Sequence, residues 1–244
     1  MENRLSENIK KIYKRIAHAA MRAGRGPEEV RLIAVSKNVP ASSVRQAVEA
    51  GLRDFGENRI QEFSAKRELL SRYVDLHSPE APLGYRVSWH LIGHLQKNKA
   101  KAGVELFDII HSVDSLELAV MINKFAGNAG KIQRILIQVK LSDEESKYGI
   151  LKEELMDILN ATSAMKSLRV EGLMTIPPFF DDPEKVRPFF RELRETRDRA
   201  AARGFSLAGL SMGMSHDFEV AIEEGATMVR VGTALFGERR KEAA

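Results

Sequence analysis

Short apolar segments alternate with helix-like segments along the whole chain, and this alternation limits the possible folds more than any other feature. The first apolar run, residues 32–35, is continuous, as expected for a strand covered on both faces by helices. Strands that alternate with helices form parallel sheets, because a parallel connection needs a crossover. The predicted strands cover residues 31–36, 53–56, 87–92, 107–111, 132–139, 168–173, 206–210 and 227–231.

The segments between these strands show helical periodicity or helix-end signals. Residues 3–23 place Leu5, Ile9, Ile12 and Ile16 at spacings of four and three, which predicts one amphipathic helix before the first strand. Residues 71–86 contain prolines and a glycine and predict a loop. Further helices are predicted over 42–50, 57–70, 115–125, 151–161, 183–203 and 215–225, and from residues 96 and 233 onward.

Eight strands alternating with eight helical segments favour a single (β/α)8 barrel with an extra N-terminal helix. An open doubly wound sheet is the alternative. No Gly-x-Gly-x-x-Gly motif follows the first predicted strand, which argues against the dinucleotide-binding version of that sheet. With 244 residues, the chain has the length of one barrel domain spanning residues 1–244.

Composition excludes several kinds of chemistry. The chain has no cysteine, so it has no disulfide, thiolate nucleophile or cysteine metal site, and this suits a reducing compartment. The net charge of +4 is spread along the sequence and decides little about partners. The N-terminus is charged from Glu2 onward and no apolar run approaches membrane-span length. We therefore expect a cytoplasmic protein without a signal peptide or a membrane segment.

Lys37 follows the first predicted strand directly, at the edge where a βα-barrel carries its chemistry. A partly desolvated lysine there loses its proton near neutral pH and attacks a carbonyl to form a Schiff base. A solvated loop lysine is the alternative interpretation of this residue taken alone.

The loops after the seventh and eighth strands bind phosphate in many barrels. Here residues 211–215 read Ser-Met-Gly-Met-Ser and residues 230–234 read Arg-Val-Gly-Thr-Ala. Gly213 and Gly232 would let the backbone approach an anion closely, and Ser215 and Thr233 would donate hydrogen bonds. Ordinary turns and helix caps are the alternative for either loop alone.

Arg230 ends an otherwise apolar strand, where arginine is rarely buried without a partner. It either forms a structural ion pair or meets a ring nitrogen of a bound cofactor. Because arginine stays protonated, that nitrogen would stay unprotonated and the ring would be a weaker electron sink. Lys37, the phosphate loops and Arg230 together suit a phosphorylated aldehyde with an aromatic nitrogen, which describes pyridoxal 5′-phosphate.

Six motifs in this chain resemble the pyridoxal phosphate homeostasis protein family (the YggS/PROSC group). They lie at residues 34–37, 55–59, 89–99, 171–174, 211–215 and 230–237. The resemblance runs from about residue 5 to residue 237 and implies a barrel like the N-terminal domain of alanine racemase, the fold type III of pyridoxal phosphate proteins.

The resemblance also implies roles for individual residues. Pyridoxal phosphate would form a Schiff base with Lys37, and Asn58 would line its pocket. Ser215, Gly232 and Thr233 would contact the phosphate, and Arg230 would lie near the pyridine nitrogen. Met174 at the end of the sixth strand is a further candidate for ring contact, although methionine at such a position more often serves packing.

The family resemblance implies a monomer that binds the cofactor and hands it to pyridoxal phosphate-dependent apo-enzymes, without established catalysis. A racemase-like enzyme is the alternative, and it needs acid–base groups on both faces of its intermediate. The chain ends soon after the eighth strand, so we expect no added β-domain to supply the second group. A Schiff-base aldolase without cofactor is a third alternative.

Several other polar residues permit two interpretations. His90 and His94 have a spacing that suits a metal only on a helix, so we expect hydrogen bonding or pocket-wall roles and no metal site. His111 ends a predicted strand, either facing the barrel mouth or serving only as a strand end. Tyr148 is a surface residue or a second acid–base group. The lysines of residues 97–101 predict a solvated face or a weak anion surface, and we expect no nucleic-acid binding.

Overall fold

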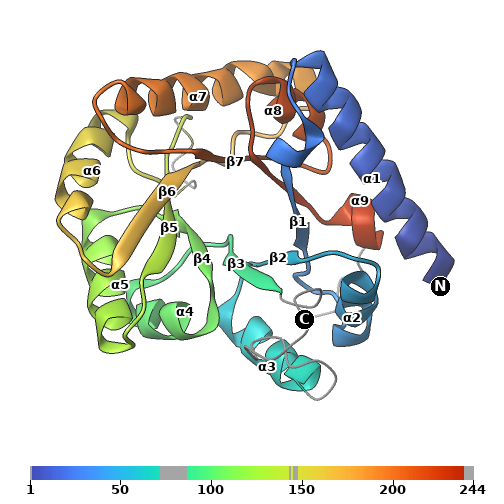
Figure 1. The fold of residues 1–244 in the computed structure, drawn as a ribbon, viewed down its shortest axis with the longest axis horizontal. Coiled ribbons are helices and arrows are strands. Elements are labelled where there is room, and N and C mark those ends of the chain that lie inside the picture. The colour runs from blue at the N-terminus through green and yellow to red at the C-terminus, as the bar shows by residue number, and fades with distance from the viewer. Residues whose placement is uncertain (1, 72–86, 143, 145–147, 239–244) are drawn as a thin grey trace.

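The computed structural model describes residues 2–71, 87–142, 144 and 148–238. Within them the strands pair in parallel and in sequence order, and β8 pairs with β1 to close a barrel (Figure 1). The predicted (β/α)8 barrel is confirmed, and the open-sheet alternative is wrong. The strands are β1 (Arg31–Val35), β2 (Asp54–Glu57), β3 (Ser88–Leu91), β4 (Ile109–Val113), β5 (Gln133–Gln138), β6 (Leu168–Met174), β7 (Gly209–Met214) and β8 (Met228–Val231).

Helices surround the barrel and cover the outer face of its strands (Figure 1). No helix in the described part of the chain is long and apolar enough to cross a membrane. The α-helices that follow strands are α2 (Ala41–Glu49), α3 (Ile60–Ser71), α4 (Ala100–Leu106), α5 (Leu116–Asn128), α6 (Leu155–Ser163), α7 (Arg187–Ala201), α8 (Phe218–Glu223) and α9 (Thr233–Phe236). Short 3-10 helices are η1 (Pro27–Glu29), η3 (Lys97–Lys99), η4 (Lys152–Glu154) and η5 (Pro183–Val186).

The extra helix expected before the first strand is present as α1 (Glu2–Arg22). Its apolar face, which includes Ile9, Ile12 and Ile16, is buried. The helix lies along α8 and α9 on the outside of the barrel (Figure 1). It therefore covers the part of the helix ring that follows the last two strands.

Apolar side chains form two layers of core. Between strands and helices, Trp89 of β3 packs against Phe63 of α3, with ring centroids 4.5 Å apart, and Phe63 packs against Phe107 at 4.7 Å. A smaller group fills the inside of the barrel, as expected for alternate residues of each strand. Its members are Ile33, Ile109, Leu136, Met174 and Met228.

Two strands lie two or more residues further along the chain than the sequence predicted. The seventh strand is Gly209–Met214 rather than 206–210. Residues 211–214 of the predicted phosphate loop at 211–215 therefore belong to a strand. The fourth is Ile109–Val113 rather than 107–111. The pairing of β7 with β8 shifts its register between Ser211 and Met214, so β7 continues through Gly213. In the sequence this glycine had indicated a turn. The predicted loop at 71–86, after its first residue, and the end of the chain at 239–244 lie outside the described residues.

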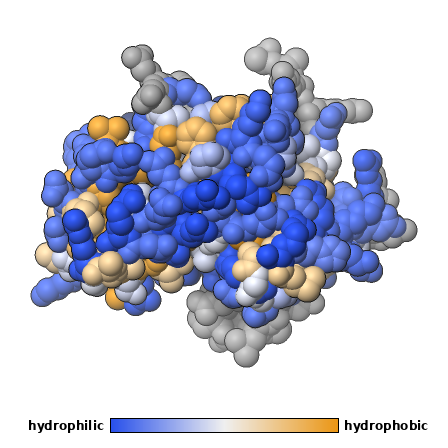
Figure 2. Space-filling view, turned by 90° about the horizontal axis from the view of Figure 1, so that it is seen from above, coloured by the Kyte–Doolittle hydropathy of each residue, from blue (hydrophilic) through white to orange (hydrophobic). Residues whose placement is uncertain are grey.

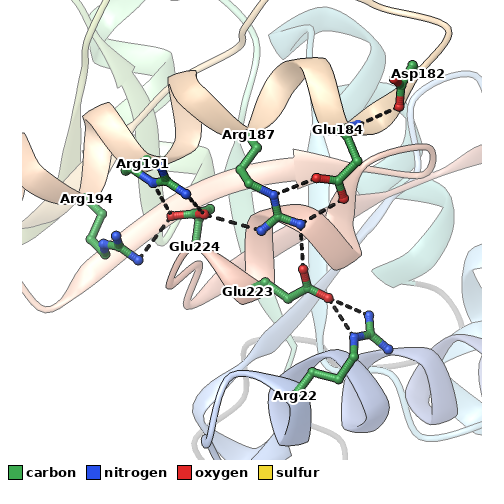
Figure 3. A network of polar contacts seen from close by, with 8 residues as sticks. All are labelled: Arg22, Asp182, Glu184, Arg187, Arg191, Arg194, Glu223 and Glu224. Carbon is green, nitrogen blue, oxygen red and sulfur yellow. Dashed lines mark hydrogen bonds and ion pairs between the residues drawn. The ribbon is translucent and has the colours of Figure 1, made fainter.

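An ion-pair network ties α7 to the end of α8 (Figure 3). The Glu224 side chain, which is 6% exposed, lies at the C-terminal end of α8. It pairs with three arginines of α7, namely Arg187, Arg191 and Arg194, at 3.3, 3.0 and 3.1 Å. Burial alone would raise the pKa of Glu224, but the hydrogen bonds from Arg191 and Arg187 lower it below its ordinary value.

The same network reaches the N-terminal helix. Glu223 pairs with Arg187 and with Arg22 of α1, both at 2.7 Å. The network lies on the side of the molecule at the top of Figure 1, and this side, seen face-on in Figure 2, is largely hydrophilic. Because Glu223 and Glu224 lie at the C-terminal end of α8, these contacts hold that end of the helix, just before the chain enters β8.

We expect Glu224→Gln to lower the free energy of unfolding by about 2 kcal/mol near neutral pH, because the charge-assisted hydrogen bonds from Arg187 and Arg191 and the ion pair with Arg194 lose their negative partner. The folded-state pKa of Glu224 is lowered, so its contribution is present above the unfolded pKa and is lost as the pH falls below about 4. Urea unfolding at several pH values measures this difference.

Asp198→Asn on α7 is the matched control. Its ion pair with Arg197 is a surface contact, with the Asp198 side chain 56% exposed, so we expect little change. Equal losses in the two variants would contradict a special role for the Glu224 cluster.

Candidate functional site

A cavity of about 380 Å³ opens at the carboxyl ends of the barrel strands. It brings together residues from the first two and last two strand ends, which lie far apart in the sequence. The candidates that line it are Lys37, Asn58, Ser215, Arg230, Gly232 and Thr233. Ile92, Ile176 and Phe179 add an apolar side to the same cavity.

Lys37 reaches this cavity because of the alternation along β1. Ile33 lies in the inner barrel core and Val35 lines the cavity, so Lys37, two residues later, continues the inward-facing series. The Lys37 side chain is half-buried. The role of Lys37 as a reactive amine stays a prediction.

The backbone on both sides of Lys37 is held by charged side chains of β2 and α3. Lys66 Nζ donates to the Ser36 carbonyl and to Glu57 Oε1, both at 2.6 Å, and Ser36 Oγ donates to the same carboxylate oxygen at 2.7 Å. Glu62 Oε1 accepts from Lys66 Nζ at 3.2 Å and from the Asn38 N–H at 2.5 Å. We call these residues the loop clamp.

The loop clamp holds an unusual backbone conformation. Asn38 has a φ of 55°, in the left-handed region that few residues other than glycine adopt. The side chain of Glu57 is completely buried, and its Oε2 has no hydrogen-bond partner among the described residues. Burial raises the pKa of Glu57 above its ordinary value, although Lys66 acts in the opposite direction.

The sequence did not reveal Lys66 or Glu62 as part of the site. Both lie on α3, where charged residues usually face water, and only their contacts with β1 and β2 show otherwise. A lysine one helical turn after a glutamate is too common a pattern to indicate such a role.

The loops after β7 and β8 meet at Ser215. Its Oγ accepts hydrogen bonds from the N–H groups of Gly232 and Ala234 at 3.2 and 3.4 Å. Two backbone donors from one loop thus converge on an oxygen atom from the other. Such convergence is the arrangement that an anion requires. Ser215 does not cap α8, contrary to the sequence prediction, because Asp217 is the residue before that helix.

Arg230 is buried at the cavity wall. It is 3% exposed and donates to Ser211 Oγ at 2.8 Å and to the Thr175 carbonyl at 2.9 Å. Burial lowers the pKa of Arg230 to about 10, and the negative charge of Asp217 opposes this shift. The guanidinium therefore remains charged at neutral pH. The sequence analysis did not identify Asp217 as part of the site. Its position directly before α8 is the one signal that could have indicated it.

Comparison with known proteins shows the family of this chain. The family model described as alanine racemase, N-terminal domain, matches residues 4–240. The pyridoxal phosphate homeostasis protein of Aquifex aeolicus (strain VF5) is 45% identical over 235 residues, covering 96% of this chain and 98% of the relative. The chain belongs to this family. The Escherichia coli K12 protein of the same name is 40% identical over 240 residues, covering 97% of each chain.

Solved structures give the same result for the fold. PipY of Synechococcus elongatus PCC7942, solved with pyridoxal phosphate bound, is 38% identical with a TM-score of 0.80, covering 96% of this chain and all of PipY. Alanine racemase of Clostridium difficile 630 is 15% identical with a TM-score of 0.70, covering 98% of this chain and 58% of the racemase. The second similarity concerns the fold alone. The resemblance to the pyridoxal phosphate homeostasis protein family is confirmed.

Two of the candidate cofactor-binding residues, Met174 and Gly213, do not line the 380 Å³ cavity. Met174 is completely buried in the inner barrel core. Gly213 lies in β7 with a φ of 89°, and a Cβ there would come within 2.5 Å of Ala221 Cβ. This glycine is therefore required by the strand conformation and by the packing of α8.

A second cavity of about 630 Å³ adjoins the first, and Asn58 lines both. Here Tyr148 stacks on His94 with ring centroids 3.6 Å apart, and His94 Nδ1 lies 3.1 Å from Asp114 Oδ2. Tyr148 and His94 thus stack on each other, and His94 also contacts the Asp114 carboxylate. Within residues 2–71, 87–142, 144 and 148–238 no group of three metal-ligating side chains is present.

We expect Lys66→Met to lower the free energy of unfolding by about 3 kcal/mol near pH 8, because it leaves the Glu57 carboxylate buried without its counter-charge. Glu57 already has a raised folded-state pKa, and this change raises it further. Folding then takes up a proton, so the stability of the variant decreases as the pH rises above the unfolded pKa. Urea unfolding at about pH 5 and pH 8 measures the loss, which should be smaller at pH 5.

Adding Glu57→Gln to this variant is the control. The amide carries no charge, so the additional loss at high pH should disappear. A loss that is equal at both pH values in Lys66→Met would contradict the ion-pair account of the loop clamp.

Proposed function

We propose that this protein binds pyridoxal 5′-phosphate as a Schiff base with Lys37 and holds it without catalysing turnover. The observation that carries this proposal is the cavity that joins Lys37, Arg230 and the convergent donors around Ser215. The names of the relatives and the cofactor bound to PipY support the same ligand. The protein would act in the cytoplasm as a monomer, one barrel domain over residues 1–244, and pass the cofactor to apo-enzymes that depend on it.

The chemical groups of the cofactor match groups in the cavity. An aldehyde reacts with the amine of Lys37, and phosphate oxygens suit the N–H groups of Gly232 and Ala234. Those N–H groups now make long hydrogen bonds of 3.2 and 3.4 Å to Ser215, so an anion would offer them a stronger acceptor. Asn58 and the apolar side formed by Ile92 would border the ring. When bound, the cofactor supplies an aldehyde and an electron-withdrawing ring.

Arg230 favours binding over turnover. Its guanidinium donates hydrogen bonds and accepts none, so a pyridine nitrogen facing it would remain unprotonated. An unprotonated ring withdraws electrons less strongly and stabilises a carbanion poorly. The racemase-like alternative is tested by following α-proton exchange on a panel of amino acids. Turnover above about 1 s⁻¹, an ordinary enzyme rate, would contradict a carrier role.

We expect the purified protein with pyridoxal phosphate to absorb visible light and Lys37→Ala to lose this absorbance, because a Schiff base requires the lysine amine. Borohydride reduction followed by peptide mapping should place the label on Lys37 in the wild type. Lys99→Ala is the matched control, since Lys99 lines the neighbouring cavity. A label on another lysine, or visible absorbance retained in Lys37→Ala, would exclude the proposed attachment.

We expect Ser215→Ala to weaken pyridoxal phosphate binding by about tenfold, which corresponds to one lost charge-assisted hydrogen bond of about 1.4 kcal/mol. Pyridoxal, which lacks the phosphate, should bind the wild type and the variant equally. Equilibrium titrations with both ligands measure this. The same loss with pyridoxal would mean that Ser215 acts through the shape of the loop and not through the phosphate.

A further inference from the structure

Polar side chains cross the barrel interior in an unbroken series of hydrogen bonds that begins at Arg230. Arg230 Nη1 donates to Ser211 Oγ at 2.8 Å, and Ser211 Oγ lies 2.9 Å from His111 Nδ1. His111 Nε2 lies 2.9 Å from His90 Nδ1, and His90 Nε2 lies 2.9 Å from Asp54 Oδ1. Ser211, His111 and His90 are completely buried. We call these five residues the barrel relay.

The two ends of the barrel relay and the neutrality of its two imidazoles together determine the direction of every bond. An arginine only donates and a carboxylate only accepts. Ser211 accepts from Arg230, and when both imidazoles are neutral its own O–H donates to His111 Nδ1. His111 Nε2–H then donates to His90 Nδ1, and His90 Nε2–H donates to Asp54. Both imidazoles are neutral with the proton on Nε2.

The reverse direction requires a charged histidine. If His111 Nδ1–H donated to Ser211, then His90 would have to donate from both ring nitrogens, as an imidazolium. Burial lowers the pKa of His90, although Asp54 acts in the opposite direction. Burial lowers the pKa of His111 well below its ordinary value, and the charge of Arg230 lowers it further. Both shifts favour the neutral pair.

The barrel relay extends from the cavity to the opposite edge of the barrel. Asp54 is the first residue of β2, its side chain is 20% exposed, and it lies 3.7 Å from Arg31. The charged groups that act on the two imidazoles are Asp54, Asp108, Arg31, Arg134 and Arg230. In each hydrogen bond of the barrel relay the donated hydrogen points away from Arg230 and the accepting lone pair points toward it. The dipoles of Ser211, His111 and His90 are therefore aligned and stabilise the guanidinium charge.

We propose that Ser211, His111 and His90 are positioning residues that keep Arg230 charged and fixed toward the ring of the ligand in the cavity. This inference rests on the proposed function, in which the ring belongs to pyridoxal phosphate. Protonation of either imidazole adds a positive charge near Arg230 and breaks one bond of the barrel relay. Cofactor affinity should therefore fall as the pH falls below the ordinary range of histidine.

Nitrogen-15 NMR of the cofactor-free protein tests the barrel relay without any ligand. We expect His90 and His111 to be neutral Nε2–H tautomers from about pH 8 to pH 6, and Ser211→Ala to change the His111 signals. Ser112→Ala is the matched control, because Ser112 is equally buried and its hydroxyl has no partner among the described residues. An imidazolium or an Nδ1–H tautomer at either histidine would overturn the proposal.

Cofactor titration tests the positioning role. We expect Ser211→Ala to weaken pyridoxal phosphate binding about tenfold and to alter its pH dependence, while Ser112→Ala resembles the wild type. Ser211→Thr, which restores the hydroxyl, should recover most of the affinity. Equal affinities and pH profiles in Ser211→Ala and Ser112→Ala would overturn the proposal. A wild type that binds no cofactor would instead refute the proposed function, and the NMR result would still decide the direction of the barrel relay.

Discussion

The pairing of β1 with β8 is the constraint on which the rest of the site depends. It sets Ile33 beside Arg230 and Ala34 beside Val231, although these residues lie at opposite ends of the chain. Because side chains alternate along a strand, this register sends Lys37 and Arg230 into the same cavity. A register shifted by one residue would place one of them among the helices and leave a charge in the apolar layer.

Charges that support the cavity are buried in pairs. Lys66 faces Glu57 below the Lys37 loop, and Asp217 offsets the charge of Arg230. Buried ion pairs contribute little net stability, since desolvation offsets their attraction, so their value here lies in the geometry they impose. The loop clamp holds Asn38 in its left-handed conformation, whereas apolar residues of equal volume would leave that backbone without partners.

The sequence predicts those parts of the site that lie at strand ends. Lys37, Ser215 and Gly232 follow recognisable strands, and the order of strands in a closed barrel places them together. The sequence did not predict the loop clamp, because the position of Lys66 in a helix indicates an exposed side chain. The barrel relay was also missed, since the predicted fourth strand ended at His111, which in fact lies in the middle of β4. A displacement of two residues is the usual error at strand boundaries, and it hid an inward-facing histidine.

A buried arginine that stays charged needs a counter-charge, and burial makes each additional carboxylate costly. The barrel meets this need with Asp217 nearby and with Asp54, which is partly accessible to water. The two imidazoles and Ser211, which lie between Arg230 and Asp54, carry no net charge, so the interior holds oriented dipoles instead of further ions. This arrangement explains how an interior packed with Ile33, Leu136 and Met228 retains one polar column without an isolated charge.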